Sequence, residues 1–259
     1  MARWAAFPQA GAFRHDAASV ARDWARLHTG DAEPLPAEPA VLQAWVLFHN
    51  GAFQEAAEAG LAAGGAGVTV ANKAQCIHAN YLEKDEKARL DLFLEAAERA
   101  QQQAADEPGN PNAWYWQAYA LGRYSQAVSV AKALAQGLGS RVKQSLERTI
   151  ALQPLHATGH LALATFHAEV IDKVGSLIGS MTYGASKDKS LQLFREALRL
   201  HPESPIVLVE YAKGLVRLEG DRQAGEAARL YREAAALQPM DAMEWLDVAM
   251  ARSVAEHAA

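Results

Sequence analysis

The 259-residue sequence contains a single cysteine, Cys76, and no excess of basic residues. One cysteine cannot form a disulfide within the chain, so a disulfide-stapled fold is excluded. We interpret Cys76 as a small buried apolar residue. The formal net charge of −5 provides no basic surface, and we therefore predict no nucleic-acid partner.

Long apolar runs and catalytic signatures are also missing. No stretch approaches the ~20 apolar residues that span a bilayer, and residues 1–16 lack the apolar core of a signal peptide. We predict no membrane span and a cytoplasmic location, or a periplasmic one if a leader has been removed. The sequence has no nucleophile elbow, Walker loop or dinucleotide fingerprint, so we predict neither catalysis nor a cofactor.

Helical spacing of apolar residues, by contrast, runs through most of the chain, and strand-like alternation is nearly absent. These patterns predict an all-α fold. One phrase recurs in the C-terminal half, as RTIALQP ending at Pro154, REALRLHP ending at Pro202 and REAAALQP ending at Pro239. Each copy is the end of an amphipathic helix, followed by a polar turn and a new helix. Such recurrence indicates stacked helix pairs, which usually display a concave surface to a partner.

We predict about twelve helices in a helix-pair solenoid. Their ranges are 14–28, 39–49, 52–63, 70–83, 86–104, 112–136, 139–152, 156–178, 187–200, 204–218, 222–237 and 240–256. The stretch DEPGNPN at 106–112 is the clearest internal break. We therefore predict a region 1–107 with one or two degenerate helix pairs and a repeat array at 108–259, within one continuous solenoid.

These helix pairs resemble tetratricopeptide repeats (TPRs), in which small residues allow two helices to cross closely and large residues fill the gaps. The residues that match the second helix of the repeat are Phe194 and Ala197, and Ala227, Tyr231 and Ala234. Those that match the first helix are Trp114, Ala118 and Leu121, and Leu208, Ala212 and Leu215. The match extends over about residues 108–250 and, in part, over 38–63.

The repeats are longer than ordinary TPRs, because Pro108, Pro154, Pro202 and Pro239 follow one another at more than the usual spacing of about 34 residues. Elongated pairs of this kind resemble the TPR-like proteins related to the regulator of microtubule dynamics. They also resemble the T component of tripartite ATP-independent periplasmic transporters, which implies a helical cavity for an apolar ligand. Part of the extra length is the apolar stretch 174–184, interpreted as a flap over the groove or as a longer helix with a flexible end.

The repeat positions that line the groove of a TPR protein, counted along this sequence, predict a candidate groove. Its residues are Tyr115, Tyr119, Arg123, Thr158, Leu161, Thr165, Glu169, Val209, Lys213 and Arg217. This mixture is apolar with a few charges, which suits an amphipathic helix or a lipid-like ligand better than an acidic peptide.

The leading hypothesis is thus a non-catalytic interaction scaffold that binds a peptide or helix of a partner protein. The alternative is a carrier of an apolar small molecule. The chain's own N- or C-terminal helix is a further candidate occupant of the groove, and a homodimer is a candidate cover for the apolar stripe in residues 243–259.

Three histidines form a weak candidate metal site. His156 and His160 are spaced as on a zinc-binding helix, and His167 lies two turns further along the same face. The TPR register, however, places His160 and His167 at packing positions, and no glutamate lies between His156 and His160 as the HExxH motif requires. We interpret the three side chains as structural and predict no metal.

Overall fold

The computed structural model describes residues 3–257, and these residues form helices and connecting segments without a β-strand. The all-α prediction is confirmed. The chain forms two compact units. The first contains the chain up to His28, Glu33–Leu152 and Asp241–Met243, and the second contains Thr29–Ala32, Gln153–Met240 and the chain from Glu244 onward.

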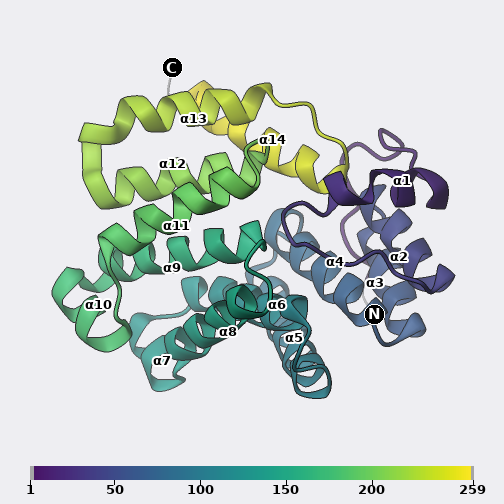
Figure 1. Cartoon of the computed structure of the whole chain (residues 1–259), viewed down its shortest axis with the longest axis horizontal. Helices are drawn as coiled ribbons and strands as arrows, with labels where there is room; N and C mark the ends of the chain where they lie inside the picture. Colours follow the sequence, from purple (N-terminus) through teal and green to yellow (C-terminus); the bar gives the residue numbers. More distant parts are fainter. Residues whose placement is uncertain (1–2, 258–259) are drawn as a thin grey trace. The chain divides into compact units, whose positions relative to one another are not determined.

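The first unit is built from helix pairs (Figure 1). Its helices are α1 (Ala17–Leu27), α2 (Pro39–His49), α3 (Phe53–Ala63), α4 (Gly67–Tyr81), α5 (Glu86–Asp106), α6 (Pro111–Ala127), α7 (Val130–Ala135) and α8 (Leu138–Leu152). Helix α2 packs on α3, α4 on α5 and α6 on α8, while α4 also contacts both α2 and α6. A row of first helices, each backed by a second helix, is the arrangement of stacked TPR-like repeats.

The second unit continues the same construction. Its helices are α9 (Ala157–Val174), α10 (Ser176–Tyr183), α11 (Lys187–Leu200), α12 (Pro205–Glu219), the 3₁₀ helix η1 (Gly220–Gln223), α13 (Ala224–Ala236) and α14 (Ala242–His257). Helix α9 packs on α11, α12 on α13, and the first helices α9 and α12 contact each other. Ala251 of α14 joins the core between α12 and α13.

Local sequence signals account for the helix starts. Pro39, Pro111 and Pro205 each lie in the first turn of a helix, where the missing N–H removes no hydrogen bond. The side chain of Asn110 caps α6 by accepting from the Asn112 amide at 2.9 Å. The prolines that punctuate the sequence therefore mark helix boundaries, as predicted.

The residues at TPR positions form the core of the second unit. Phe194 and Ala197 of α11 and Ala212 of α12 have no exposed surface. Gly214 of α12 lies directly against the ring of Phe194, so close that a Cβ on this glycine would collide with the ring. Complementary large and small residues thus determine how closely α11 and α12 approach.

Helix α4 is covered on every side, although it carries several polar side chains. Every residue from Thr69 to Ala79 is buried. Arg99 of α5 donates to Asn72 Oδ1 at 3.3 Å and to Gln75 Oε1 at 2.9 Å. Gln103 of α5 donates to Thr69 Oγ1 at 2.9 Å. These bonds satisfy polar groups that would otherwise be costly to bury.

Two predicted helices are each divided in the structure. The predicted helix 112–136 ends at Ala127, and a new helix starts at Val130 because Ser129 accepts from the Lys132 amide at 3.2 Å. The predicted helix 156–178 ends at Val174, since Gly175 has φ of 81°, a conformation that ends a helix. Residues 3–257 therefore contain more helices than the predicted number.

The predicted regions 1–107 and 108–259 of one continuous solenoid stay a prediction. Helices α5 and α6, on the two sides of residues 107 and 108, both belong to the first unit and pack on each other. The Pro108-Gly109 turn reverses the chain between these neighbouring helices, and the first unit continues to Leu152.

The contact between α11 and α12 gives a test of the core. Gly214→Ala is expected to lower the free energy of unfolding by about 1–3 kcal/mol, because the new methyl group displaces the Phe194 ring. The matched control is Gly225→Ala on α13, where a Cβ would meet no atom within 4 Å. This control is expected to keep or raise stability, by up to about 1 kcal/mol. Urea unfolding followed by circular dichroism measures both variants, and equal stability would contradict the proposed packing.

Candidate functional site

The predicted groove residues of the first unit lie on one face of α6. Tyr115 is buried, and its ring centre lies 6.1 Å from that of Tyr119. The guanidinium carbon of Arg123 lies 5.2 Å from the centre of the Tyr119 ring, within the range of a cation–π contact. The side chains of Tyr119 and Arg123 are partly exposed, so this face of α6 is accessible and charged toward the C-terminal end of the helix.

The predicted groove residues of the second unit fall into two groups. Leu161 of α9 and Val209 of α12 are buried in the core clusters of this unit. Thr158 is half-buried, and its hydroxyl donates to the Gly30 carbonyl at 3.2 Å.

The charged members remain accessible. Arg217 of α12 donates to Glu169 of α9 at 3.2 Å, with 33% and 19% of the two side chains exposed. Lys213 pairs with Glu210 at 2.8 Å, and Thr165 is half-buried on α9. The accessible part of this face is therefore polar and charged.

Two of the three candidate metal-binding histidines hydrogen-bond to nearby backbone. His156 precedes α9 and its Nδ1 accepts from the Gly159 amide at 2.9 Å. His160 Nε2 donates to the Pro154 carbonyl at 2.9 Å, and His167 is fully buried. Among residues 3–257, no group of three or more His, Cys, Asp or Glu residues is placed to hold a metal ion.

A buried aromatic and histidine cluster in the first unit was not predicted. Trp24 and His28 of the N-terminal segment stack with ring centres 3.9 Å apart, and both contact the indole of Trp45 on α2 edge-on. His28 Nε2 also lies 3.3 Å from His49 Nε2. The segment that contains α1 is thus attached to α2 by stacked rings that exclude water.

His49 connects this cluster to a carboxylate. Its Nδ1 lies 2.7 Å from Asp241 Oδ2, and both side chains are buried. Burial lowers the pKa of His49, and Asp241 opposes that shift without reversing it. In the neutral ring, Nδ1–H donates to Asp241 and Nε2 accepts from His28.

The segment after α1 reaches the other end of the row of first helices. Trp24 Nε1 donates to the Glu33 carbonyl at 2.7 Å, and the Glu33 carboxylate accepts from Asn112 of α6. Parts of the chain that precede α2 thus contact both α2 and α6 of the first unit.

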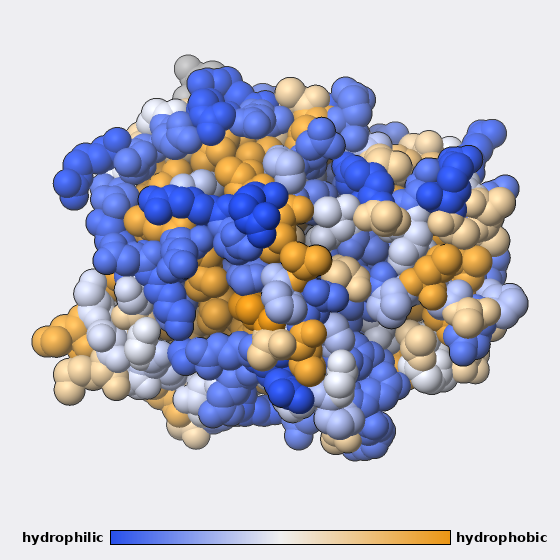
Figure 2. Space-filling model, in the orientation of Figure 1, coloured by the Kyte–Doolittle hydropathy of each residue, from blue (hydrophilic) through white to orange (hydrophobic). Residues whose placement is uncertain are grey.

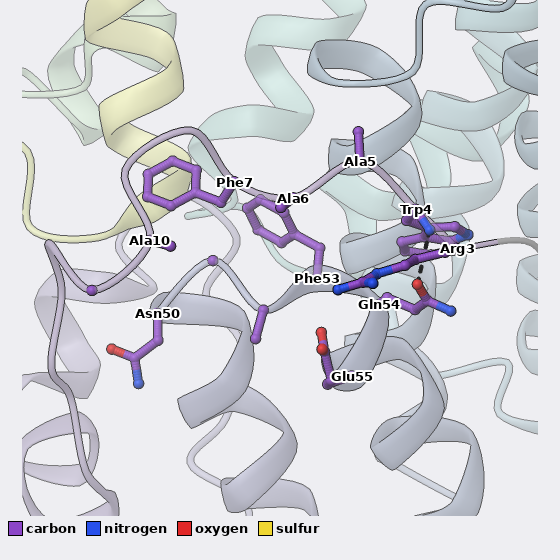
Figure 3. A pocket seen from close by; sticks show the side chains of 13 residues that line it. Arg3, Trp4, Ala5, Ala6, Phe7, Ala10, Asn50, Phe53, Gln54 and Glu55 are labelled. Carbon is purple, nitrogen blue, oxygen red and sulfur yellow. Dashed lines mark hydrogen bonds between the residues drawn. The ribbon is translucent and has the colours of Figure 1, made fainter.

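The extreme N-terminal segment is anchored separately. Trp4 stacks on His78 of α4 at 4.5 Å, and the Ala5 amide donates to His78 Nε2 at 3.1 Å. Phe7 packs directly on Gly51, where a Cβ would lie 2.6 Å from the Phe7 ring. Beneath the segment is a pocket of about 310 Å³, in which Phe7 faces Phe53 (Figure 3).

No sequence motif predicts these contacts, because they join residues far apart in the chain. A signal was nevertheless present in the composition of the N-terminal region. Trp4, Phe7 and Trp24 lie in a segment without repeat character, and large aromatic residues there need a surface on which to pack.

The helix pairs of this chain match those of a known protein family. Residues 68–252 match the family described as regulator of microtubule dynamics protein 1-3. The chain belongs to this family. The resemblance to these proteins is thereby confirmed, whereas the resemblance to the transporter T component stays a prediction.

A solved structure supports the same architecture. The crystal structure of a thermophilic TPR protein from Thermus thermophilus matches with a TM-score of 0.58 and 18% identity, over 83% of this chain and 97% of that chain. At this identity the likeness shows the fold alone, and it confirms the TPR-like prediction. The curated proteins contain no match to the chain. Within residues 3–257, none of the helices has the length and apolar character needed to cross a membrane.

Attachment of residues 3–10 to α4 is expected to depend on pH. Burial lowers the pKa of His78, against an opposing effect of Glu83. The unfolded value is about 6.5, so the stabilisation by neutral His78 is present above that pH and is lost as the pH falls through the lower folded value. A protonated Nε2 cannot accept from the Ala5 amide.

Hydrogen exchange of residues 3–10, corrected for intrinsic rates, is therefore expected to show weaker protection at pH 5.5 than at pH 7.5. His78→Phe keeps a ring for Trp4 but removes the acceptor, and should make this protection lower and independent of pH. Unchanged protection of the parent chain across this interval would show that His78 does not hold the segment.

Proposed function

We propose that the chain is a non-catalytic interaction scaffold that binds a peptide or helix of a partner protein on the inner face of α9 and α12. Its family membership and its TPR-like helix pairs support a scaffold in general. The observation that carries the finer proposal is the half-exposed ion pair between Glu169 and Arg217, which joins two neighbouring first helices.

The chemistry of this face favours a polypeptide over an apolar ligand. Leu161 and Val209, the expected apolar walls, are buried in the unit's own core. What remains accessible is Thr165, Lys213 and the ion pair, which offer hydrogen bonds and charges of both signs. Such groups suit a peptide backbone and charged side chains, and they select partners by electrostatic complementarity.

The first unit supports the same assignment. Its helices α2 and α6 already contact the chain itself, through Trp24 and His28 on α2 and Glu33 on α6. The His49–Asp241 pair has the geometry of an acid–base centre, but both side chains are buried beyond the reach of a substrate. We assign this pair to structure, and recognition to the second unit.

A photo-crosslinking amino acid placed at Thr165 tests the proposal in an extract of the native host. We expect it to capture a defined polypeptide, whereas the same group at Arg232, exposed on α13, should not. The captured segment, made as a labelled peptide, then allows fluorescence anisotropy with charge variants. Arg217→Glu is expected to weaken binding about tenfold or more, and Arg232→Glu to leave it unchanged.

Three results would contradict the proposal. Crosslinking of the same proteins at both positions would indicate a nonspecific surface. A peptide that binds equally well to Arg217→Glu would place recognition elsewhere. Native mass spectrometry that found a bound apolar molecule of a few hundred daltons, released on denaturation, would favour the carrier.

A further inference from the structure

Helix α10 displays three large apolar side chains to solvent. Leu177, Ile178 and Met181 are 75%, 57% and 81% exposed. They lie within two turns of an eight-residue helix, so they form one continuous patch. Figure 2 shows hydrophobic atoms at this projecting edge, over α10. Contiguous apolar residues on a surface usually mark an interaction site.

The exposure of the patch follows from how α10 is held. On its opposite side, Gly179 is buried against α9, with a Cβ position only 2.9 Å from Val170 Cγ1. The ring of Tyr183 packs edge-on against Phe166 of α9, with centres 5.8 Å apart. These contacts orient the helix, so the apolar side chains point away from α9.

The sequence around the patch lacks the charged side chains that a segment exposed to water usually carries. Residues 174–186 contain no charged side chain. Charged residues flank this stretch on both sides: Asp172 and Lys173 precede it, and Lys187, Asp188 and Lys189 follow it. An apolar segment flanked by charged residues whose signs nearly cancel fits an environment that is apolar inside and polar at its surface.

We propose that α10 inserts Leu177, Ile178 and Met181 into the surface of a lipid bilayer. A second copy of the chain is a poor occupant, because three side chains offer much less than the ~800 Å² per partner of a stable protein interface. A bilayer surface accepts apolar groups to a depth of ~5–10 Å without requiring a shaped partner, which matches a short projecting patch. Since the flanking charges nearly cancel, insertion depends on apolar burial and is insensitive to salt.

The test uses Met181→Cys labelled with an environment-sensitive dye. Labelling is selective because Cys76 is fully buried and burial raises the pKa of its thiol. On addition of fluid phosphatidylcholine vesicles we expect a blue shift of the dye and quenching by lipids that carry a shallow quencher. The same dye at Arg232→Cys on α13 is the control and should not respond.

Cosedimentation of the unlabelled chain with the same vesicles supplies a second readout. The variant with both Leu177→Ser and Met181→Ser is expected to bind at least about tenfold more weakly. Leu155→Ser, which replaces a leucine that is 62% exposed outside the patch, should bind like the parent. Binding by the parent should persist at high salt.

Several outcomes would overturn the proposal. A dye at residue 181 that stays in a water-like environment at millimolar lipid would exclude insertion. Binding that disappears at high salt would show that charges, and not the patch, hold the vesicle. A dye signal that rises with protein concentration and ignores lipid would identify a second copy as the occupant. None of these results depends on the peptide site on α9 and α12.

Discussion

The burial of α4 is the constraint on which the first unit depends. A helix with no exposed residue between Thr69 and Ala79 must satisfy its own polar side chains inside the protein. Helix α5 meets that requirement through Arg99 and Gln103. Lys73 is placed over the rings of Trp45 and Phe48 on α2, at 5.2 and 5.0 Å. Polar complementarity to α4, as well as apolar packing, thus determines which helices lie beside it.

Contacts of the chain with its own first helices bear on where a partner could bind. In a stack of TPR-like pairs, the inner faces of the first helices are the natural binding surface. In the first unit, α2 and α6 already contact other parts of the chain, because Trp24 and His28 lie against Trp45 of α2 and Glu33 accepts from Asn112 of α6. In the second unit, the corresponding face of α9 and α12 keeps charged side chains in contact with water. This difference favours the second unit for recognition of a partner.

Much of the fold was predictable, because it is encoded locally. Prolines, capping residues and helical periodicity predicted most helix boundaries, including Pro39–His49 and Lys187–Leu200 without error. The breaks at Ser129 and Gly175 were missed, since the apolar pattern continues across both positions while a single cap or a positive φ interrupts the helix. Helix α4 was expected to begin later, because glycines obscure its start. Gly67 instead allows close contact with Gly60 of α3.

The candidate site was less predictable for a physical reason. The TPR register predicted which positions would line a groove, but it could not tell which of them the chain would bury. Leu161 and Val209 became core residues, whereas Lys213 and Arg217 stayed accessible. Nor could spacing along the chain bring His28, His49 and Asp241 together, because such contacts depend on the tertiary structure.

Hydrogen exchange across residues 67–81 of the intact chain, compared between the parent and Trp24→Ala, tests the central claim most directly. Trp24 contacts the ring of Trp45 on α2, and Lys73 of α4 lies over that ring. If these contacts stabilise the first unit around α4, the parent should exchange these amides slowly, by unfolding of that unit. Trp24→Ala should then lose protection in α2 and α4 and keep it in α12. Rapid exchange in the parent, or protection of α4 that does not depend on Trp24, would contradict the account.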